Sequence, residues 1–117
     1  MKVGILGSGL VGRVLGAGFL KYGHGVMLGT RNPAKPEVQQ WLRENPGGSA
    51  GTFQQAAQFG GLIVLATLGR AAEEAIALAG PANFVGKTVM DTTNPIADTP
   101  PVQGVLAFTT GIPATVL

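Results

Sequence analysis

Residues 1–13 read MKVGILGSGLVGR, and this stretch decides the fold. The apolar run at 3–6 is too short for a helix and stops at Gly7, which predicts a buried strand. Gly7, Gly9 and Gly12 then follow with the spacing G-x-G-x-x-G. When this spacing directly follows a strand and opens a helix, it is typical of a turn that holds the pyrophosphate of a dinucleotide.

Each glycine of this loop has a separate expected role. Gly7 permits the tight turn, Gly9 lets the backbone approach a pyrophosphate, and Gly12 lets the helix pack closely on the sheet. Backbone amides at the start of the helix would face the phosphates. The competing interpretation is that the glycines serve only helix packing, which the further Gly16 favours in part. The predicted cofactor-binding residues of the loop are Gly7, Ser8, Gly9, Leu10, Val11 and Gly12.

Strand-length apolar runs and helical spacings alternate through the rest of the chain. We expect a helix from Leu10 to a stop at Gly23, since apolar residues recur there every three or four positions. Its predicted buried face consists of Val11, Val14, Leu15, Gly18, Phe19 and Tyr22. Further helices are expected from Pro36, over 53–59 behind a Thr52 cap, and over 72–79. Strands are predicted at 26–28, 62–66 and 88–90, and the rhythm places an edge strand at 49–51.

This alternation predicts an α/β fold of the Rossmann type. The uninterrupted apolar run at 62–66 indicates a strand buried on both faces, as in a parallel sheet covered by helices. Right-handed crossovers then give a doubly wound sheet with three α/β/α layers and strand order 3-2-1-4-5. The ligand crevice of such a sheet lies outside the carboxyl ends of strands one and four.

The chain of 117 residues is expected to form a single Rossmann-type domain, with residues 1–99 as its core and 100–117 as a tail. The tail contains one strand-like run, Val105 to Phe108, and no closing helix, so the chain resembles a fragment of a longer protein. Its apolar end at Val116 and Leu117 has no element to cover it. We therefore expect a homodimer, with a tail that folds back over its own domain as the alternative.

Residues 29–35 read GTRNPAK and indicate which dinucleotide binds. NAD-preferring domains carry an acidic residue near this position, and the stretch has none. An arginine offers a planar donor fork, a threonine a hydroxyl and a lysine a mobile charge, all suited to a 2'-phosphate. The predicted cofactor is NADP(H), bound through Thr30, Arg31, Asn32 and Lys35. The alternative is that Arg31 and Lys35 are ordinary solvated cations.

The loops after the fourth and fifth strands are expected to form the other wall of the crevice. Small and hydroxyl-bearing residues there, Thr92 among them, suit a ribose, a phosphate and a nicotinamide. The residues predicted to bind the cofactor in these loops are Ala66, Thr67, Leu68, Gly69, Thr93, Asn94 and Pro95. Asp91 is expected to form a turn. Arg70 fits a phosphate ligand and a solvated cation equally well.

Several function classes lack their usual residues. The chain has no cysteine, and its one histidine, His24, is expected in a surface turn at the far end of the sheet, so we predict no metal site and no catalytic side chain. Eight basic and six acidic residues are scattered without a run of like charge, which argues against a nucleic-acid partner. No apolar run is long enough for a membrane helix. We expect a cytoplasmic protein, and Trp41 in its core.

The stretches 1–13, 30–35, 62–69 and 91–95 together resemble the NADP-dependent oxidoreductases that use the deazaflavin coenzyme F420. The resemblance spans the chain and is to the amino-terminal, NADP-binding half of that family. It implies that Thr30, Arg31 and Lys35 bind the 2'-phosphate, and that residues 9–11 bind the pyrophosphate. It also implies that a further segment completes the deazaflavin pocket and the dimer.

The reaction implied by this resemblance is hydride transfer between NADPH and a deazaflavin. Such a transfer needs two rings held face to face more than it needs an acid or a base. Other NADP reductases share the first motif, among them pyrroline-carboxylate reductases and membrane metalloreductases, so the acceptor is a deazaflavin-like or another small molecule. The alternative function is an NADP-binding module, truncated or regulatory, without catalytic activity of its own.

Overall fold

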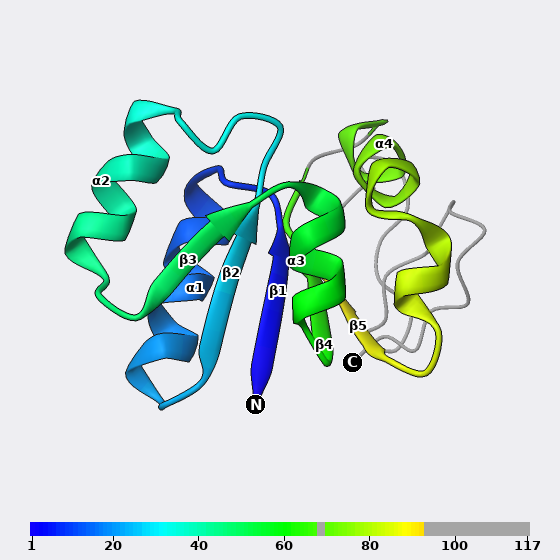
Figure 1. The fold of residues 1–117 in the computed structure, drawn as a ribbon, viewed down its shortest axis with the longest axis horizontal. Coiled ribbons are helices and arrows are strands. Elements are labelled where there is room, and N and C mark those ends of the chain that lie inside the picture. Colours follow the sequence, from blue (N-terminus) through cyan, green and yellow to red (C-terminus); the bar gives the residue numbers. More distant parts are fainter. Residues whose placement is uncertain (68–69, 93–117) are drawn as a thin grey trace, which may run out of the picture.

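The computed structural model describes residues 1–67 and 70–92, apart from the side chain of Arg70. Its centre is a parallel sheet in the order β3-β2-β1-β4-β5, which confirms the predicted topology (Figure 1). The strands are β1 (Lys2–Leu6), β2 (Gly25–Gly29), β3 (Gly48–Gly51), β4 (Leu62–Leu65) and β5 (Thr88–Asp91). Because all neighbours run parallel, their carboxyl ends meet at one edge of the sheet.

Helices connect successive strands, as expected. They are α1 (Leu10–Lys21), α2 (Pro36–Glu44), α3 (Phe53–Phe59) and α4 (Arg70–Ala79), and a 3-10 helix, η1 (Pro81–Phe84), precedes β5. Pro36 opens α2 in the first turn, where its missing amide costs nothing. Thr52 and Gln55 form a capping box at α3, in which each side chain accepts a bond from the other's backbone amide, at 3.1 and 2.9 Å.

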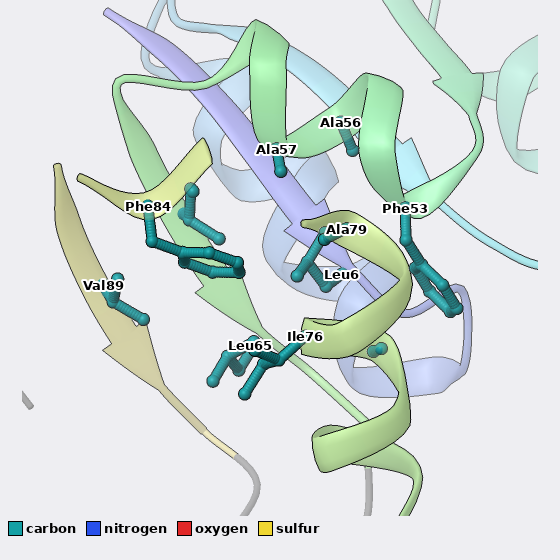
Figure 2. Close-up of a cluster of buried hydrophobic side chains, with 11 residues drawn as sticks. Leu6, Phe53, Ala56, Ala57, Leu65, Ile76, Ala79, Phe84 and Val89 are labelled. Carbon is teal, nitrogen blue, oxygen red and sulfur yellow. The ribbon is translucent and has the colours of Figure 1, made fainter. Parts of the chain in front are cut away.

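The two faces of the sheet are covered by different helices. Side chains alternate along each strand, so β4 directs Ile63 and Leu65 toward α3 and α4, and Leu62 and Val64 toward the face that α1 and α2 cover. Figure 2 shows the first of these clusters, where side chains from α3, α4, η1 and β5 gather on the sheet. The result is the predicted three-layer α/β/α arrangement.

The buried face of α1 matches the prediction only in part. Val14 and Tyr22 are 60% and 78% exposed, and Val11 is exposed as well, whereas the buried positions of the helix are Gly12 and Gly16. A Cβ on Gly16 would lie 2.8 Å from the ring of Trp41, so the helix backbone packs directly on its neighbours at this position. Leu15 and Phe19 of the predicted face are partly buried and pack against the core, so the apolar spacing is confirmed at these two positions. It missed Gly12 and Gly16 because the closest packing needs the smallest residues.

The tail falls outside the described residues, so the strand expected at Val105 to Phe108 and the division at residue 99 stay predictions. Within the part of the chain that is described, no helix combines the length and the apolar composition needed to cross a membrane.

Candidate functional site

A pocket of about 560 Å³ opens at the edge where the carboxyl ends of the strands meet. Its walls come from the glycine loop, from the segment after β2, from the amino end of α3 and from the segments after β4 and β5. The lining residues are Gly7, Ser8, Gly9, Leu10, Val11, Thr30, Arg31, Lys35, Phe53, Ala66, Thr67, Ala71 and Thr92. The pocket therefore lies where the sequence predicted a crevice.

Gly7 and Gly12 are glycines for reasons internal to the protein. Gly7 has a φ of +132°, and a Cβ there would come within 2.7 Å of the carbonyl oxygen of Ala66. A Cβ on Gly12 would run into the carbonyl oxygen of Gly7. Gly12 accordingly does not line the pocket, and its role is to bring α1 close to β1.

Gly9 has no such internal reason. Its φ of −73° and ψ of −173° suit any residue, and a Cβ built there meets no atom of the described residues within 4 Å. Gly9 nevertheless lines the pocket at the very start of α1, where it is the N-cap. The space in front of it is therefore open to a ligand that approaches the backbone.

The amino end of α1 offers donors to that space. No side chain in the described part of the protein caps this helix end, and the amides of its first turn have no acceptor within the helix. Leu10 and Val11, which belong to this turn, line the pocket. Free amides together with the positive end of the helix dipole make an anion site, which suits the pyrophosphate of a dinucleotide.

Thr30 links the glycine loop to the end of β2. It is 2% exposed, and its hydroxyl oxygen accepts bonds from the Ser8 hydroxyl at 3.1 Å and from the Asn32 amide at 3.3 Å. Its own amide donates to the carbonyl oxygen of Gly51 at 3.0 Å. Thr30 thus connects three segments around the pocket. The sequence predicted that Thr30 binds the 2'-phosphate, and it gave no indication of this positioning role.

Two cations line the pocket beyond Thr30. Arg31 forms an ion pair with Glu74 of α4, and both side chains are about half exposed. Lys35 is the N-cap residue of α2 and is exposed. Asn32, which was expected to bind the cofactor, does not line the pocket. Its Oδ1 accepts a bond from the Ala34 amide at 3.0 Å and so shapes the loop between the cations.

Two threonines lie on the opposite wall. Thr92 donates from its hydroxyl to the carbonyl oxygen of Leu65 at 2.6 Å, which ties the end of β5 to β4. The Thr67 hydroxyl is buried and has no hydrogen-bond partner among the described residues. Such an unpartnered group in a pocket wall fits a polar ligand. The predicted site residues Leu68, Gly69, Thr93, Asn94 and Pro95 lie outside the described residues.

Two lining residues were absent from the prediction, Phe53 and Ala71, which stand in the first turns of α3 and α4. The sequence did contain a signal for Phe53, because a residue that follows the carboxyl end of β3 reaches the same edge of the sheet as the glycine loop. For Ala71 the expected segment was correct, and the contributing position differs. Thr92, which directly follows β5, lines the pocket as expected.

His24 lies away from this pocket, in the turn between α1 and β2, as predicted. It is only partly exposed, and its ring packs edge-on against Phe19 at a centroid distance of 6.0 Å. Across the described part of the chain, no group of three or more His, Cys, Asp or Glu residues is placed to hold a metal ion. Trp41 is buried in the core, where its indole nitrogen donates to the carbonyl oxygen of Arg13 at 2.8 Å.

The chain matches one protein family over most of its length. Residues 2–95 match the model of the family described as "NADP oxidoreductase coenzyme F420-dependent". No curated protein matches the chain.

Several solved structures share the fold. A protein from Arthrobacter sp. FB24, proposed to be an F420-dependent NADP reductase, has 37% identity and a TM-score of 0.74, over 78% of this chain and 44% of its own. An imine reductase from Pseudomonas sp. has 25% identity and a TM-score of 0.65, over 79% of this chain and 32% of its own. An imine reductase from Streptomyces aurantiacus shares the fold at 21% identity with a TM-score of 0.67, over 80% of this chain and 32% of its own. The chain therefore spans less than half the length of these proteins.

Proposed function

The chain belongs to the family of coenzyme F420-dependent NADP oxidoreductases, and on this premise we propose that its pocket binds NADP(H) as the cofactor domain of an oxidoreductase. The single observation that carries the proposal is Gly9. Nothing among residues 1–67 and 70–92 requires a glycine there, yet a side chain would occupy the space in front of the uncapped end of α1. A pyrophosphate that contacts this backbone explains the residue.

Different residues around the pocket would bind different parts of the dinucleotide. Amides of the first turn of α1 would hold the pyrophosphate, and the unpartnered hydroxyl of Thr67 would meet a polar group on the facing wall. Arg31 and Lys35 would bind the 2'-phosphate. Residues 29–35 contain no acidic side chain, which would accept hydrogen bonds from the ribose hydroxyls and repel that phosphate. When bound, NADPH supplies the hydride of the reaction.

The hydride acceptor of the complete protein is a deazaflavin in this proposal. The family description and the name of the Arthrobacter protein support it. The pocket contributes positioning groups and amides, which fits a transfer between two stacked rings that needs no acid or base from the protein.

A second candidate is a module that binds NADP(H) without turnover by itself. The observation that favours it is length, since the chain covers 44% of the Arthrobacter protein. Mixing the chain with NADPH and oxidised deazaflavin and following the absorbance of both separates the two. Loss of NADPH absorbance in step with deazaflavin reduction supports the enzyme, and tight NADPH binding without reduction supports the module.

Calorimetric titration of Gly9→Val tests the cofactor proposal itself. A side chain at this position should weaken both NADPH and NADH by at least about tenfold, because both carry the same pyrophosphate. Folding should change little, by about 1 kcal/mol or less, since Gly9 has an ordinary backbone conformation. Gly18→Ala is the matched control, because Gly18 lies on the same helix, also faces open space and does not line the pocket. Unchanged NADPH affinity in a folded Gly9→Val protein would remove the proposed pyrophosphate contact.

A further inference from the structure

The ion pair between Arg31 and Glu74 connects two parts of the fold that are distant in sequence. Arg31 lies in the segment after β2, and Glu74 lies in the first half of α4. The pair joins Nη2 of the arginine to Oε2 of the glutamate, with the two side chains 53% and 54% exposed. The Glu74 carboxylate thus already binds the Arg31 guanidinium, which in the proposed function binds the 2'-phosphate.

The position of the pair is at the side of the nucleotide pocket. A second pocket of about 340 Å³ shares Thr30, Arg31 and Phe53 with the first one. Its far wall includes Leu78, which follows Glu74 by four residues and therefore lies on the same face of α4. Arg31 is one of the residues that line both pockets, and Glu74 binds its guanidinium from the side of α4.

We propose that Glu74 is a specificity-determining residue that competes with the 2'-phosphate for Arg31 and so limits the preference of the site for NADP(H) over NAD(H). This inference rests on the proposed function. A phosphate monoester carries about −1.5 to −2 charges at neutral pH. Arriving at Arg31, it meets the Glu74 carboxylate on the same guanidinium, and it must either displace that carboxylate or bind beside a like charge.

Both routes weaken NADPH and leave NADH unaffected. If the phosphate displaces Glu74, the existing ion pair with Arg31 is lost. If both anions stay on Arg31, the phosphate and the carboxylate repel each other at short range. NADH carries a ribose hydroxyl in place of the phosphate and makes no demand on the Arg31 charge. The effect of Glu74 is therefore on the ratio of the two affinities, which a residue needed only for folding would not change.

Calorimetric titration of Glu74→Gln with NADPH and with NADH tests the inference. Removing the charge should tighten NADPH about two- to fivefold, the range expected for an exposed ion pair, and leave NADH unchanged. Glu73→Gln is the matched control, since it removes the same charge from the neighbouring position of the same helix. In an Arg31→Ala background, Glu74→Gln should change NADPH affinity much less than it does in the wild type, because it acts through Arg31. Added salt should reduce the difference between wild type and Glu74→Gln.

The outcomes separate this inference from the function on which it rests. A wild-type chain that binds no NADPH overturns the proposed function and the inference together. If NADPH binds and depends on Arg31, but Glu74→Gln leaves the NADPH affinity unchanged or weakens it, only the competition by Glu74 is overturned. A weakened affinity would mean that Glu74 holds Arg31 in place for the phosphate. Tightening of NADPH alone, absent in Glu73→Gln, supports the inference.

Discussion

The Ser8 hydroxyl donates a hydrogen bond of 3.1 Å to Oγ1 of Thr30, and this contact joins the glycine loop to the segment after β2. Thr30 is 2% exposed, so the bond is protected from water at its acceptor. The loop expected to hold the pyrophosphate and the segment expected to hold the 2'-phosphate are thereby fixed relative to each other. A single buried hydroxyl sets the spacing of two parts of the proposed site.

Replacing Ser8 with alanine should weaken NADPH by about 0.5–1.5 kcal/mol, the usual contribution of one hydrogen bond, and should weaken NADH less. The reason is that the lost bond fixes the pyrophosphate loop relative to the 2'-phosphate segment, and only NADPH uses both. Titration calorimetry with both nucleotides measures the effect. Ser49→Ala serves as control, because Ser49 makes a similar bond to the carbonyl oxygen of Val26 at 3.1 Å and does not line the pocket. Loss of affinity in both variants alike would contradict a local role for Ser8.

Two glycines of α1 should respond to alanine in opposite directions. At Gly16 the new methyl group would lie 2.8 Å from the Trp41 ring, whose indole nitrogen is fixed by its bond to Arg13, so we expect a loss of about 1–3 kcal/mol of stability. At Gly18 the methyl group meets nothing within 4 Å, and the better helix propensity of alanine should add about 0.5–1 kcal/mol. Chemical denaturation measures both. Equal effects at the two positions would argue against the tight contact between α1 and α2.

Lys35→Ala should weaken NADPH by about 0.5–1 kcal/mol and leave NADH unchanged, because an exposed lysine contributes as a mobile charge near the phosphate. Its contribution should shrink as salt is added. Titration of both nucleotides at two ionic strengths measures this. Lys21→Ala is the control, since Lys21 lies at the other end of α1 and away from the pocket. A salt-independent loss shared by NADH would show that Lys35 acts through the start of α2 instead.

Self-association of the chain stays a prediction from its apolar tail. Sedimentation over a range of concentrations should show a dimer, and deletion of residues 111–117 should weaken the dimer without changing NADPH affinity. A monomer mass at every accessible concentration would contradict this expectation.

The order of the strands could be predicted because it depends on patterns that are local in sequence. Short apolar runs ending at glycine mark the strands, and the connections between parallel neighbours follow one handedness. Even β3, whose residues are small and weakly apolar, was placed by the regular alternation of the chain. The buried face of α1 could be found only in part in this way. Leu15 and Phe19 obey the helical period and pack against the core, but Val14 and Tyr22 obey it and are exposed. Gly12 and Gly16, which the period did not select, make the closest contact.

The site could be predicted as a set of loops but less well as a set of contacts. Strand ends fix which segments meet, and this placed residues 7–11, Arg31 and Lys35 around one pocket. The bond between Ser8 and Thr30 and the ion pair between Arg31 and Glu74 join positions far apart in the chain. Such pairs depend on the three-dimensional placement of side chains, for which a single sequence carries no periodic signal.

The most direct test of the central claim, that this pocket prefers NADP(H), is calorimetric titration of NADPH and NADH into wild type and Arg31→Ala. The account predicts that the variant loses about 1.5–3 kcal/mol of NADPH affinity, the contribution of a charged hydrogen bond, and retains its NADH affinity. Arg43→Ala, which changes an exposed arginine near the other end of α2, should alter neither. An equal loss for NADPH and NADH in Arg31→Ala would contradict the claim, because it would show that Arg31 does not recognise the 2'-phosphate.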